Sequence, residues 1–287
     1  MSRVGVRKTN KLFIGGAFPR SESGRTYEVT DSKGQFLANM ALASRKDARD
    51  AVLAARSAVA KWSAATAYNR GQVLYRIAEV VEGRREQFIS EVSDSEGVSS
   101  RKAGTHVDAA IDRWVWYAGW ADKYAQVIGN TNPVAGPFFN FSVPEPTGVV
   151  AAVAPQDASV LGLVSVVAPI IVTGNAVIVM PSSSRPIPAI TLAECLATSD
   201  VPAGVVNILT GAPAEVMPWL AEHADVNALD LTGIVDEGVA ADLERSAAGT
   251  VKRVRGAAPH ADWQATPSLS RIRAFVEVKT VWHPMGV

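Results

Sequence analysis

The sequence predicts an α/β fold in which a doubly wound parallel sheet follows a set of helices. Residues 47–124 carry apolar side chains at three- and four-residue spacing, as in amphipathic helices. From Thr147 onward, short apolar runs alternate with helical patterns, which is typical of a parallel sheet with crossover helices. A chain of 287 residues is long enough for two domains, or for one large domain with an appendage.

Three amphipathic helices are expected in the first half of the chain. They cover residues 47–62, 70–92 and 107–124, and Gly83 is a weak point in the second of them. The third helix places aromatic and aliphatic residues on its apolar face, and aromatic side chains on such faces usually lie in the core. We expect burial of Trp114, Val115, Trp116 and Trp120.

The second half predicts five buried strands joined by four helices. The strands are expected at residues 149–154, 176–180, 205–209, 228–231 and 251–254, and the helices at residues 159–172, 187–197, 214–222 and 235–247. In a doubly wound sheet, ligands bind at the carboxyl ends of the strands. The loops expected there are residues 155–157, 181–184, 211–213 and 232–234.

Composition and charge exclude several classes of protein. The chain has 28 basic and 28 acidic residues, so no net charge favours nucleic acid or an anionic membrane. The longest apolar run, residues 160–172, contains Pro169 and is too short to span a bilayer. Residues 1–11 have no apolar core like that of a signal peptide, and a single cysteine fits a reducing compartment. We expect a cytoplasmic protein without membrane or nucleic-acid partners.

Common catalytic and binding motifs are missing from the sequence. There is no Gly-x-Gly-x-x-Gly after a strand, no Gly-x-x-x-x-Gly-Lys and no Gly-x-Ser-x-Gly. The four histidines are far apart and lack the spacing of metal ligands, so no metal site is predicted. The remaining functional signal lies in the residue sequences of the predicted strands and loops.

Five segments resemble, in order, signatures of the aldehyde dehydrogenase superfamily. They are residues 12–16, 117–123, 145–150, 204–211 and 231–233, and residues 275–282 are similar to the C-terminal strand of that family. The resemblance implies a Rossmann-like coenzyme-binding domain in residues 1–122 and 147–254. It also implies an oligomerisation hairpin and tail strand in residues 123–146 and 271–287. Residues 255–270 would then be a linker in place of the catalytic domain.

The resemblance implies that the catalytic groups are lost. The family reads Pro-Trp-Asn where this chain has Pro155-Gln156-Asp157, and an ionised Asp157 cannot donate a hydrogen bond to an oxyanion. A local loop-capping role explains Asp157 equally well. The segment that supplies the general base is matched by residues 255–258, which contain no carboxylate. Cys195 lies in an apolar helix without basic neighbours in sequence, as expected for an unreactive thiol.

The coenzyme contacts implied by the resemblance are also degraded. The Lys-Pro-x-Glu of the family corresponds to Met180-Pro181-Ser182-Ser183, so a thioether replaces the lysine and only Ser183 offers a weaker contact. Its Gly-Ser-x-x-x-Gly corresponds to residues 233–238, in which Ile234 lacks the hydroxyl. Binding of NAD or NADP is expected to be weak or lost. The remaining candidates for coenzyme contact are Pro155, Ser183, Gly211, Gly233 and Gly238.

The leading hypothesis is a catalytically silent subunit that assembles with a complete aldehyde dehydrogenase. Its partner would be such a full-length subunit or a second copy of the chain in a homo-oligomer. Three alternatives stay open on the sequence. They are an NAD(P)-dependent aldehyde oxidoreductase active only within a complex, a nucleotide-binding sensor and a nonfunctional gene remnant.

Overall fold

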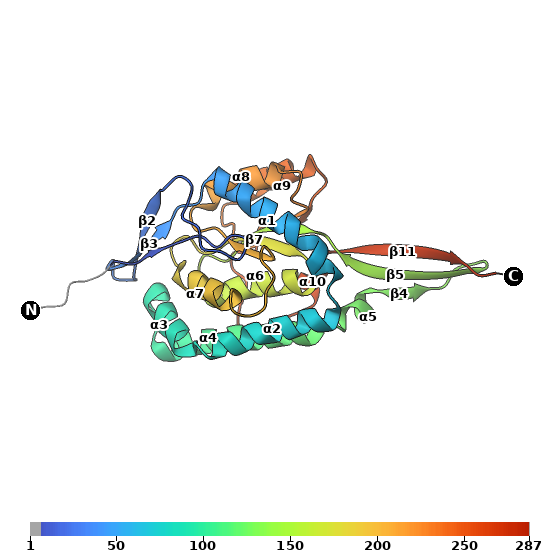
Figure 1. Ribbon diagram of the computed structural model, residues 1–287, viewed down its shortest axis with the longest axis horizontal. Helices are drawn as coiled ribbons and strands as arrows, with labels where there is room; N and C mark the ends of the chain where they lie inside the picture. The colour runs from blue at the N-terminus through green and yellow to red at the C-terminus, as the bar shows by residue number, and fades with distance from the viewer. Residues whose placement is uncertain (1–6, 287) are drawn as a thin grey trace, which may run out of the picture.

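A five-stranded parallel sheet with helices on both faces forms the centre of the molecule (Figure 1). The computed structural model describes residues 7–286, so the predictions for residues 1–6 and 287 lie outside it. The strands are β6 (Val149–Val153), β7 (Ala176–Met180), β8 (Val206–Ile208), β9 (Ala228–Asp230) and β10 (Arg253–Arg255), in the order β10-β9-β6-β7-β8. The predicted doubly wound α/β fold is confirmed.

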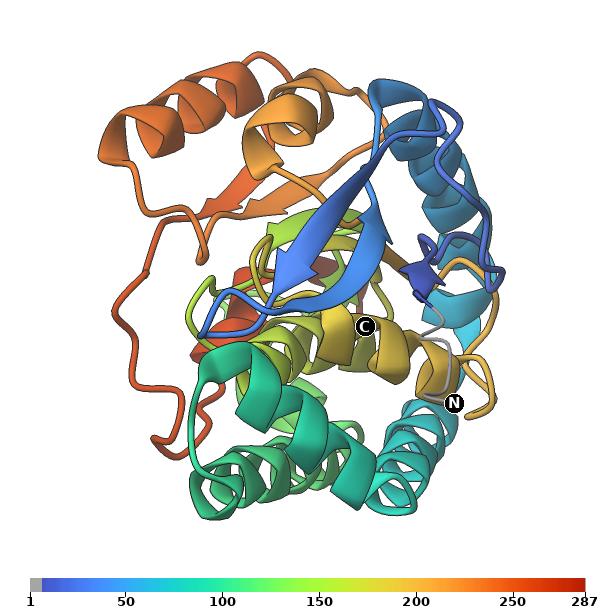
Figure 2. The same cartoon turned by 90° about the vertical axis from the view of Figure 1, so that its left-hand side faces the viewer.

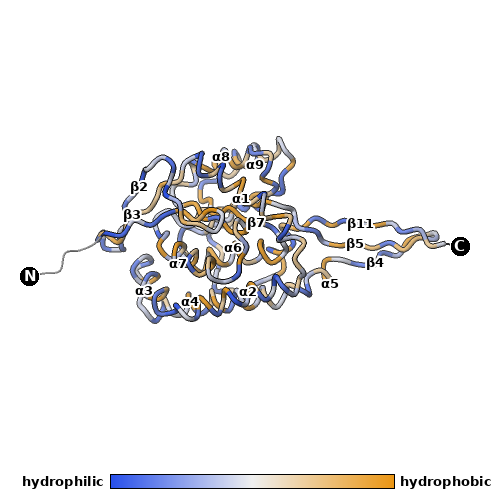
Figure 3. The backbone as a smooth tube through the Cα atoms, viewed as in Figure 1, coloured by the Kyte–Doolittle hydropathy of each residue, from blue (hydrophilic) through white to orange (hydrophobic). Residues whose placement is uncertain are grey.

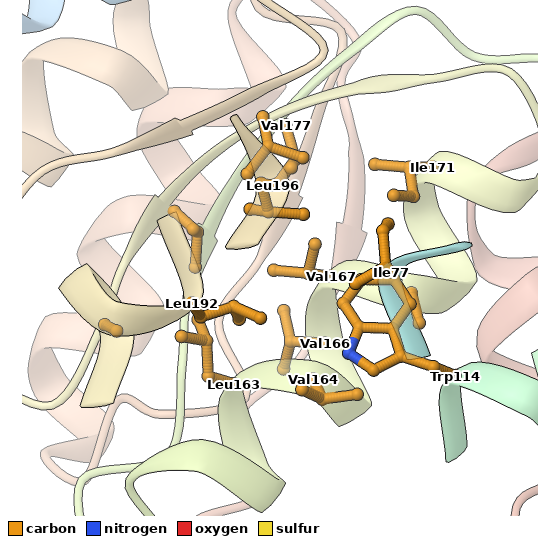
Figure 4. Close-up of a cluster of buried hydrophobic side chains, with 14 of the residues drawn as sticks. Ile77, Trp114, Leu163, Val164, Val166, Val167, Ile171, Val177, Leu192 and Leu196 are labelled. Atoms are coloured by element: carbon orange, nitrogen blue, oxygen red, sulfur yellow. The ribbon is translucent and has the colours of Figure 1, made fainter. Parts of the chain in front are cut away.

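Alternation along each strand divides the apolar residues between two cores. Val150 and Ala152 of β6 join one cluster, whereas Val149, Ala151 and Val153 join the other. Because successive side chains of a strand leave the sheet on opposite faces, a sheet covered on both sides needs apolar residues throughout. Figure 4 shows the first cluster, in which Trp114 packs near valines and leucines of two neighbouring helices.

In the part of the chain that is described, eight longer helices and one short helix pack around this sheet and form its two core clusters. The first cluster draws on α2 (Ala67–Glu82), α3 (Arg85–Glu96), α4 (Ser100–Trp120), α6 (Val160–Val172), α7 (Ile187–Leu196) and the short α10 (Ser270–Ala274). The second draws mainly on α8 (Pro213–Glu222) and α9 (Glu237–Ala248). The helix α1 (Arg45–Ala64) contributes to both clusters.

Two predictions about the helices of the first half are wrong. The single helix expected at residues 70–92 is two helices, because α2 ends at the cap residue Gly83 and Arg84 leaves the helical region at φ −115° and ψ 15°. The third helix ends at Trp120, and Tyr124 begins the separate helix α5 (Tyr124–Ile128).

The predicted burial of the aromatic face of α4 is correct for only part of it. Trp114 is fully buried, whereas Trp116 and Trp120 are half-buried and Val115 is exposed. Residues one or two positions apart on a helix point in widely different directions, so Val115 and Trp116 cannot share the face of Trp114.

The sequence interpretation missed a small N-terminal sheet. It contains β1 (Thr9–Asn10), β2 (Thr26–Thr30) and β3 (Phe36–Ala41), in the order β1-β3-β2. Asp31 accepts hydrogen bonds from the backbone N–H groups of Lys33 and Gln35, and Gly34 has φ 77°. This Asp-Ser-Lys-Gly turn was the available sequence signal.

An antiparallel sheet extends away from the body of the molecule (Figure 1). It contains β4 (Asn130–Asn132), β5 (Phe138–Pro146) and β11 (Val276–Pro284), in the order β11-β5-β4, and we call it the antiparallel arm. The predicted pairing of the tail strand with the hairpin is confirmed over the whole length of β11. Figure 3 shows hydrophobic residues along the strands of the arm, beyond the helices of the body.

Candidate functional site

The side chain of Gln156 joins the loops that follow β6 and β7. Its Nε2 donates to the carbonyl oxygen of Ala154 at 2.8 Å, and its Oε1 accepts from the backbone N–H of Ser183 at 3.0 Å. The hydroxyl of Ser182 donates to the backbone oxygen of Gln156 at 2.8 Å. The two loops are therefore tied together at the carboxyl edge of the sheet. Sequence reasoning missed this role, because a glutamine in a loop carries no recognisable pattern.

The hydroxyl of Ser183 is engaged by the same glutamine. Its Oγ donates to Oε1 of Gln156 at 3.1 Å, so a ribose hydroxyl would have to compete with an internal acceptor. Met180 is fully buried in the second core cluster and offers no donor at the loop. The structure thus brings Ser183 to the expected edge and leaves Met180 within the core.

Asp157 lies exposed in the loop after β6. Its backbone oxygen accepts a hydrogen bond from Nη1 of Arg185 at 2.5 Å, which holds the loop against the segment that follows β7. A carboxylate at this position can accept hydrogen bonds but cannot donate one at neutral pH.

Gly233 lies against the end of β6 and is required by packing. A Cβ atom at this position would lie 1.9 Å from the carbonyl oxygen of Ala154, and the N–H of Gly233 donates to the oxygen of Val153 at 2.9 Å. The next residue, Ile234, is buried in the second core cluster. The glycine therefore has a structural reason that does not depend on any ligand.

The N-terminus of α9 already carries two acidic side chains. Asp236 is its cap and accepts the N–H of Val239 through Oδ1 at 3.0 Å, and Glu237 lies in the first turn. Gly238 is exposed beside them. Helix N-termini attract anions, but a phosphate here would meet two carboxylates and lose one backbone donor to the cap.

The last two candidates, Pro155 and Gly211, are also explained by close packing. A Cβ atom on Gly162 would lie 2.9 Å from Cβ of Pro155, so the buried proline rests directly on helix α6. Gly211 has φ 134°, and a Cβ atom there would lie 2.8 Å from Cδ1 of Leu42.

Cys195 is fully buried, and burial raises the pKa of its thiol from 9.0 to about 11. Cys195 has no basic neighbour in sequence, but it has one in the folded chain: Nη1 of Arg84 lies 4.0 Å from the sulfur. Arg84 also pairs with Glu194 at 2.6 Å. The positive charge of Arg84 lowers the pKa of Cys195, but burial raises it by more. A thiol that stays protonated at neutral pH is a poor nucleophile.

Arg255 ends strand β10 at the position where the resemblance placed a general base. Its register partner on β9 is Asp230, which is fully buried and pairs with Arg271 of α10 at 3.2 Å. Neither Asp230 nor Arg271 was singled out from the sequence. Across residues 7–286, no three His, Cys, Asp or Glu side chains are grouped as metal ligands, and no helix there is long and apolar enough to cross a membrane.

Several known dehydrogenases are similar to this chain in sequence. The chain is 32% identical over 241 residues to the cytosolic 10-formyltetrahydrofolate dehydrogenase of Pongo abelii, which covers 81% of this chain and 26% of that protein. It is 30% identical to the putative aldehyde dehydrogenase DhaS of Bacillus subtilis, over 87% of this chain and 50% of the relative. The chain thus spans half the length of these curated relatives, or less.

Solved structures agree with the sequence relatives. The NAD+ complex of an aldehyde dehydrogenase from Bacillus cereus superposes with a TM-score of 0.81 at 26% identity, over 86% of this chain and 50% of that one. Residues 18–256 match the model of the aldehyde dehydrogenase family. Because this match covers most of the chain, the protein belongs to the aldehyde dehydrogenase family.

Proposed function

We propose that this chain is a catalytically silent member of its family and assembles with a complete aldehyde dehydrogenase subunit through the antiparallel arm. The observation that carries the proposal is the exposure of apolar side chains on the arm of a chain whose reactive positions are replaced. Exposed fractions are 46% for Phe139, 52% for Val278 and 57% for Trp282. Contiguous exposed apolar surface of this kind commonly marks an interaction site.

Both faces of the arm carry exposed apolar residues. Directly opposed residues of paired strands share a face, so Phe139, Phe141 and Val143 lie with Val281 on one side. On the other side, Phe138 packs edge-on against Trp282, with ring centroids 5.7 Å apart. A partner that covers either face would bury aromatic side chains, which contribute strongly to interfaces.

Strand β11 also presents a free edge. In the described residues it pairs with β5 on one side and with no strand on the other, over nine residues. Charged side chains along it, Glu277 and Lys279, pair with Arg253 and Glu145, respectively, which makes unselective strand pairing less favourable. An extended segment of a partner could add to this edge by main-chain hydrogen bonds.

Catalytic silence is supported by three positions. Cys195 is buried as a thiol, Asp157 opposes rather than stabilises an oxyanion, and Arg255 replaces a carboxylate base. The coenzyme, NAD or NADP in this family, would lack a charged donor at Met180 and would meet Asp236 at the helix terminus. We therefore expect the chain to act by holding its partner and not by turnover.

Assembly is tested by co-expressing the chain with a full-length aldehyde dehydrogenase from the same source and sizing the complex by light scattering. We expect a stable mixed oligomer, which Trp282→Asp disrupts because it places a charge on the apolar face of the arm. Leu53→Asp is the matched control, because Leu53 is exposed on α1, away from the arm. A chain that stays alone at micromolar concentration, or that forms only oligomers with itself, would contradict the proposal.

Silence is tested separately with the purified chain and with the mixed oligomer. Nicotinamide absorbance is followed with NAD or NADP and a panel of aldehydes. We expect no turnover from the chain alone, and the same rate per complete subunit when a Cys195→Ala chain replaces the parent in the oligomer. A rate that falls with Cys195→Ala would instead support an oxidoreductase active only within a complex.

A further inference from the structure

Three arginines from distant parts of the sequence gather at the carboxyl ends of β9 and β10. Arg113 of α4 is 7% exposed, Arg271 of α10 is 9% exposed, and Arg255 at the end of β10 is half-buried. Figure 2 shows the segment between β10 and α10, in red-orange, running along one side of the body. Burial of several like charges in one place is unfavourable unless anionic groups face them.

The carboxylates in this region do not balance the arginines. Asp230 is fully buried, and its Oδ2 lies 3.2 Å from Nη1 of Arg271. Its Oδ1 accepts the backbone N–H of Thr232 at 3.0 Å. The other carboxylate that acts on the cluster, Asp262, is exposed and accepts the backbone N–H of Gln264 at 2.9 Å. Within residues 7–286, Asp230 is the only carboxylate that forms an ion pair with any of the three guanidinium groups.

Arg255 differs from the other two arginines because its side chain has no hydrogen-bond acceptor within residues 7–286. Arg255 and Asp230 are register partners on adjacent parallel strands, so both side chains leave the sheet on the same face. Asp230 is nevertheless taken by Arg271, and the side chain of Arg255 forms no hydrogen bond or ion pair within residues 7–286. Its Nε is buried, and burial followed by the charge of Arg271 lowers the pKa of Arg255.

Other N–H donors in the cluster also lack acceptors. Arg113 donates through Nη2 to the carbonyl oxygens of Trp263 and Ala265, each at 2.9 Å, yet its buried Nε has no partner. The indole N–H of Trp263 is likewise buried without one, and the guanidinium of Arg271 lies over the Trp263 ring at 5.1 Å. Buried donors without acceptors are rare in folded proteins, because each such group costs free energy.

We propose that Arg255, together with Arg271, binds a small oxyanion at the carboxyl ends of β9 and β10. A guanidinium group presents paired N–H donors that match the oxygens of a carboxylate or a phosphate, and such charge-assisted bonds are stronger than neutral ones. The carboxyl end of a parallel sheet is where ligands of α/β proteins gather. The inference does not depend on a partner subunit, because all the residues involved belong to this chain.

The test uses the isolated chain with inorganic phosphate and with sodium acetate, each compared with sodium chloride at equal ionic strength. We expect one of the two oxyanions to raise the unfolding temperature beyond the chloride control. The dissociation constant of that oxyanion should rise by about tenfold or more in Arg255→Gln. Arg245→Gln is the charge-matched control, because Arg245 is exposed on α9 and pairs only with Asp242. The preferred ion distinguishes a phosphate compound from a carboxylate compound.

A measurement on the unmodified protein guards against misfolding of the variant. In a phosphate or acetate titration followed by NMR of the arginine Nε–H signals, we expect the Arg255 signal to shift and to saturate. Arg255→Lys should retain part of the affinity, because it keeps the charge and loses the paired donors. The inference is overturned if both oxyanions behave like chloride, or if Arg255→Gln and Arg245→Gln bind them equally well.

Discussion

Gly233 and Ala154 are in such close contact that a Cβ atom on residue 233 would lie 1.9 Å from the carbonyl oxygen of Ala154. The loop after β9 can therefore pass the end of β6 only with a glycine at this position. We predict that Gly233→Ala lowers the free energy of unfolding by about 3 kcal/mol or more, measured by urea denaturation. Gly238→Ala, in the exposed first turn of α9, should change it by less than about 1 kcal/mol. Equal effects at the two glycines would argue against this account of Gly233.

The buried pair Asp230–Arg271 predicts a large penalty when one partner is removed. Arg271→Met leaves the fully buried Asp230 without its cation, and we expect a loss of about 3–5 kcal/mol in the free energy of unfolding. Because Asp230→Asn removes the charge that needs Arg271, the double variant should lose less than the sum of the single changes. Additive losses in a urea double-mutant cycle would show that the two side chains do not interact.

The raised pKa of Cys195 predicts a pH dependence of stability. Below pH 9 the thiol is protonated in both states, so its preference for the buried neutral form is fully present. Between pH 9 and about 11, the unfolded chain releases this proton while the folded chain keeps it. The free energy of unfolding should therefore fall, by up to about 1.4 kcal/mol per pH unit from this group.

The comparison that isolates this effect is Cys195→Ala, whose stability should vary less between pH 9 and 10. The comparison stops at pH 10 because Tyr117 also affects stability above that pH. Burial raises the pKa of Tyr117 from 10.0 to about 12, so its ionisation also lowers the free energy of unfolding from pH 10 upward. Native Cys195 should also react with iodoacetamide far more slowly at pH 8 than the same chain in urea. Fast stoichiometric labelling of the folded protein would contradict the burial of this thiol.

The contacts of Ser183, Met180 and Asp236 predict weak coenzyme binding. We expect calorimetry to give dissociation constants for NAD and NADP no tighter than about 1 mM. Asp236→Ser keeps a side-chain acceptor for the N–H of Val239 and removes one negative charge from the terminus of α9. Any residual affinity should therefore rise in this variant, whereas micromolar binding by the parent chain would refute the predicted loss.

The predicted and observed folds agree best where the pattern is local. The apolar runs of β6 and β7 and the helical periods between them locate the central sheet to within about two residues, because buried parallel strands need continuous apolar side chains. The break at Gly83 was visible only as a weak point, since a glycine can either continue or end a helix. Helix α2 ends at Gly83, and the following helix, α3, packs on α4 and α7.

At the candidate site, the sequence predicted the positions of residues but not the contacts between their side chains. The sequence placed Ser183, Asp157 and Gly233 at the carboxyl edge of the sheet, because the order of strands and loops sets that position. It did not reveal that Gln156 engages Ser183, or that Arg84 reaches Cys195 from a different helix. Hydrogen bonds between loops depend on side-chain geometry that no spacing encodes.

The sequence by itself determined the doubly wound α/β class, and its resemblance to the family predicted the pairing of the tail strand with the hairpin. The fold class follows from periodicity, which acts over short stretches of chain, whereas the pairing was implied only by the resemblance. Only the tertiary structure decided that Arg113, Arg255 and Arg271 share one region with Asp230. Electrostatic balance depends on distances between groups far apart in sequence, so the surplus of positive charge appears only once the chain has folded.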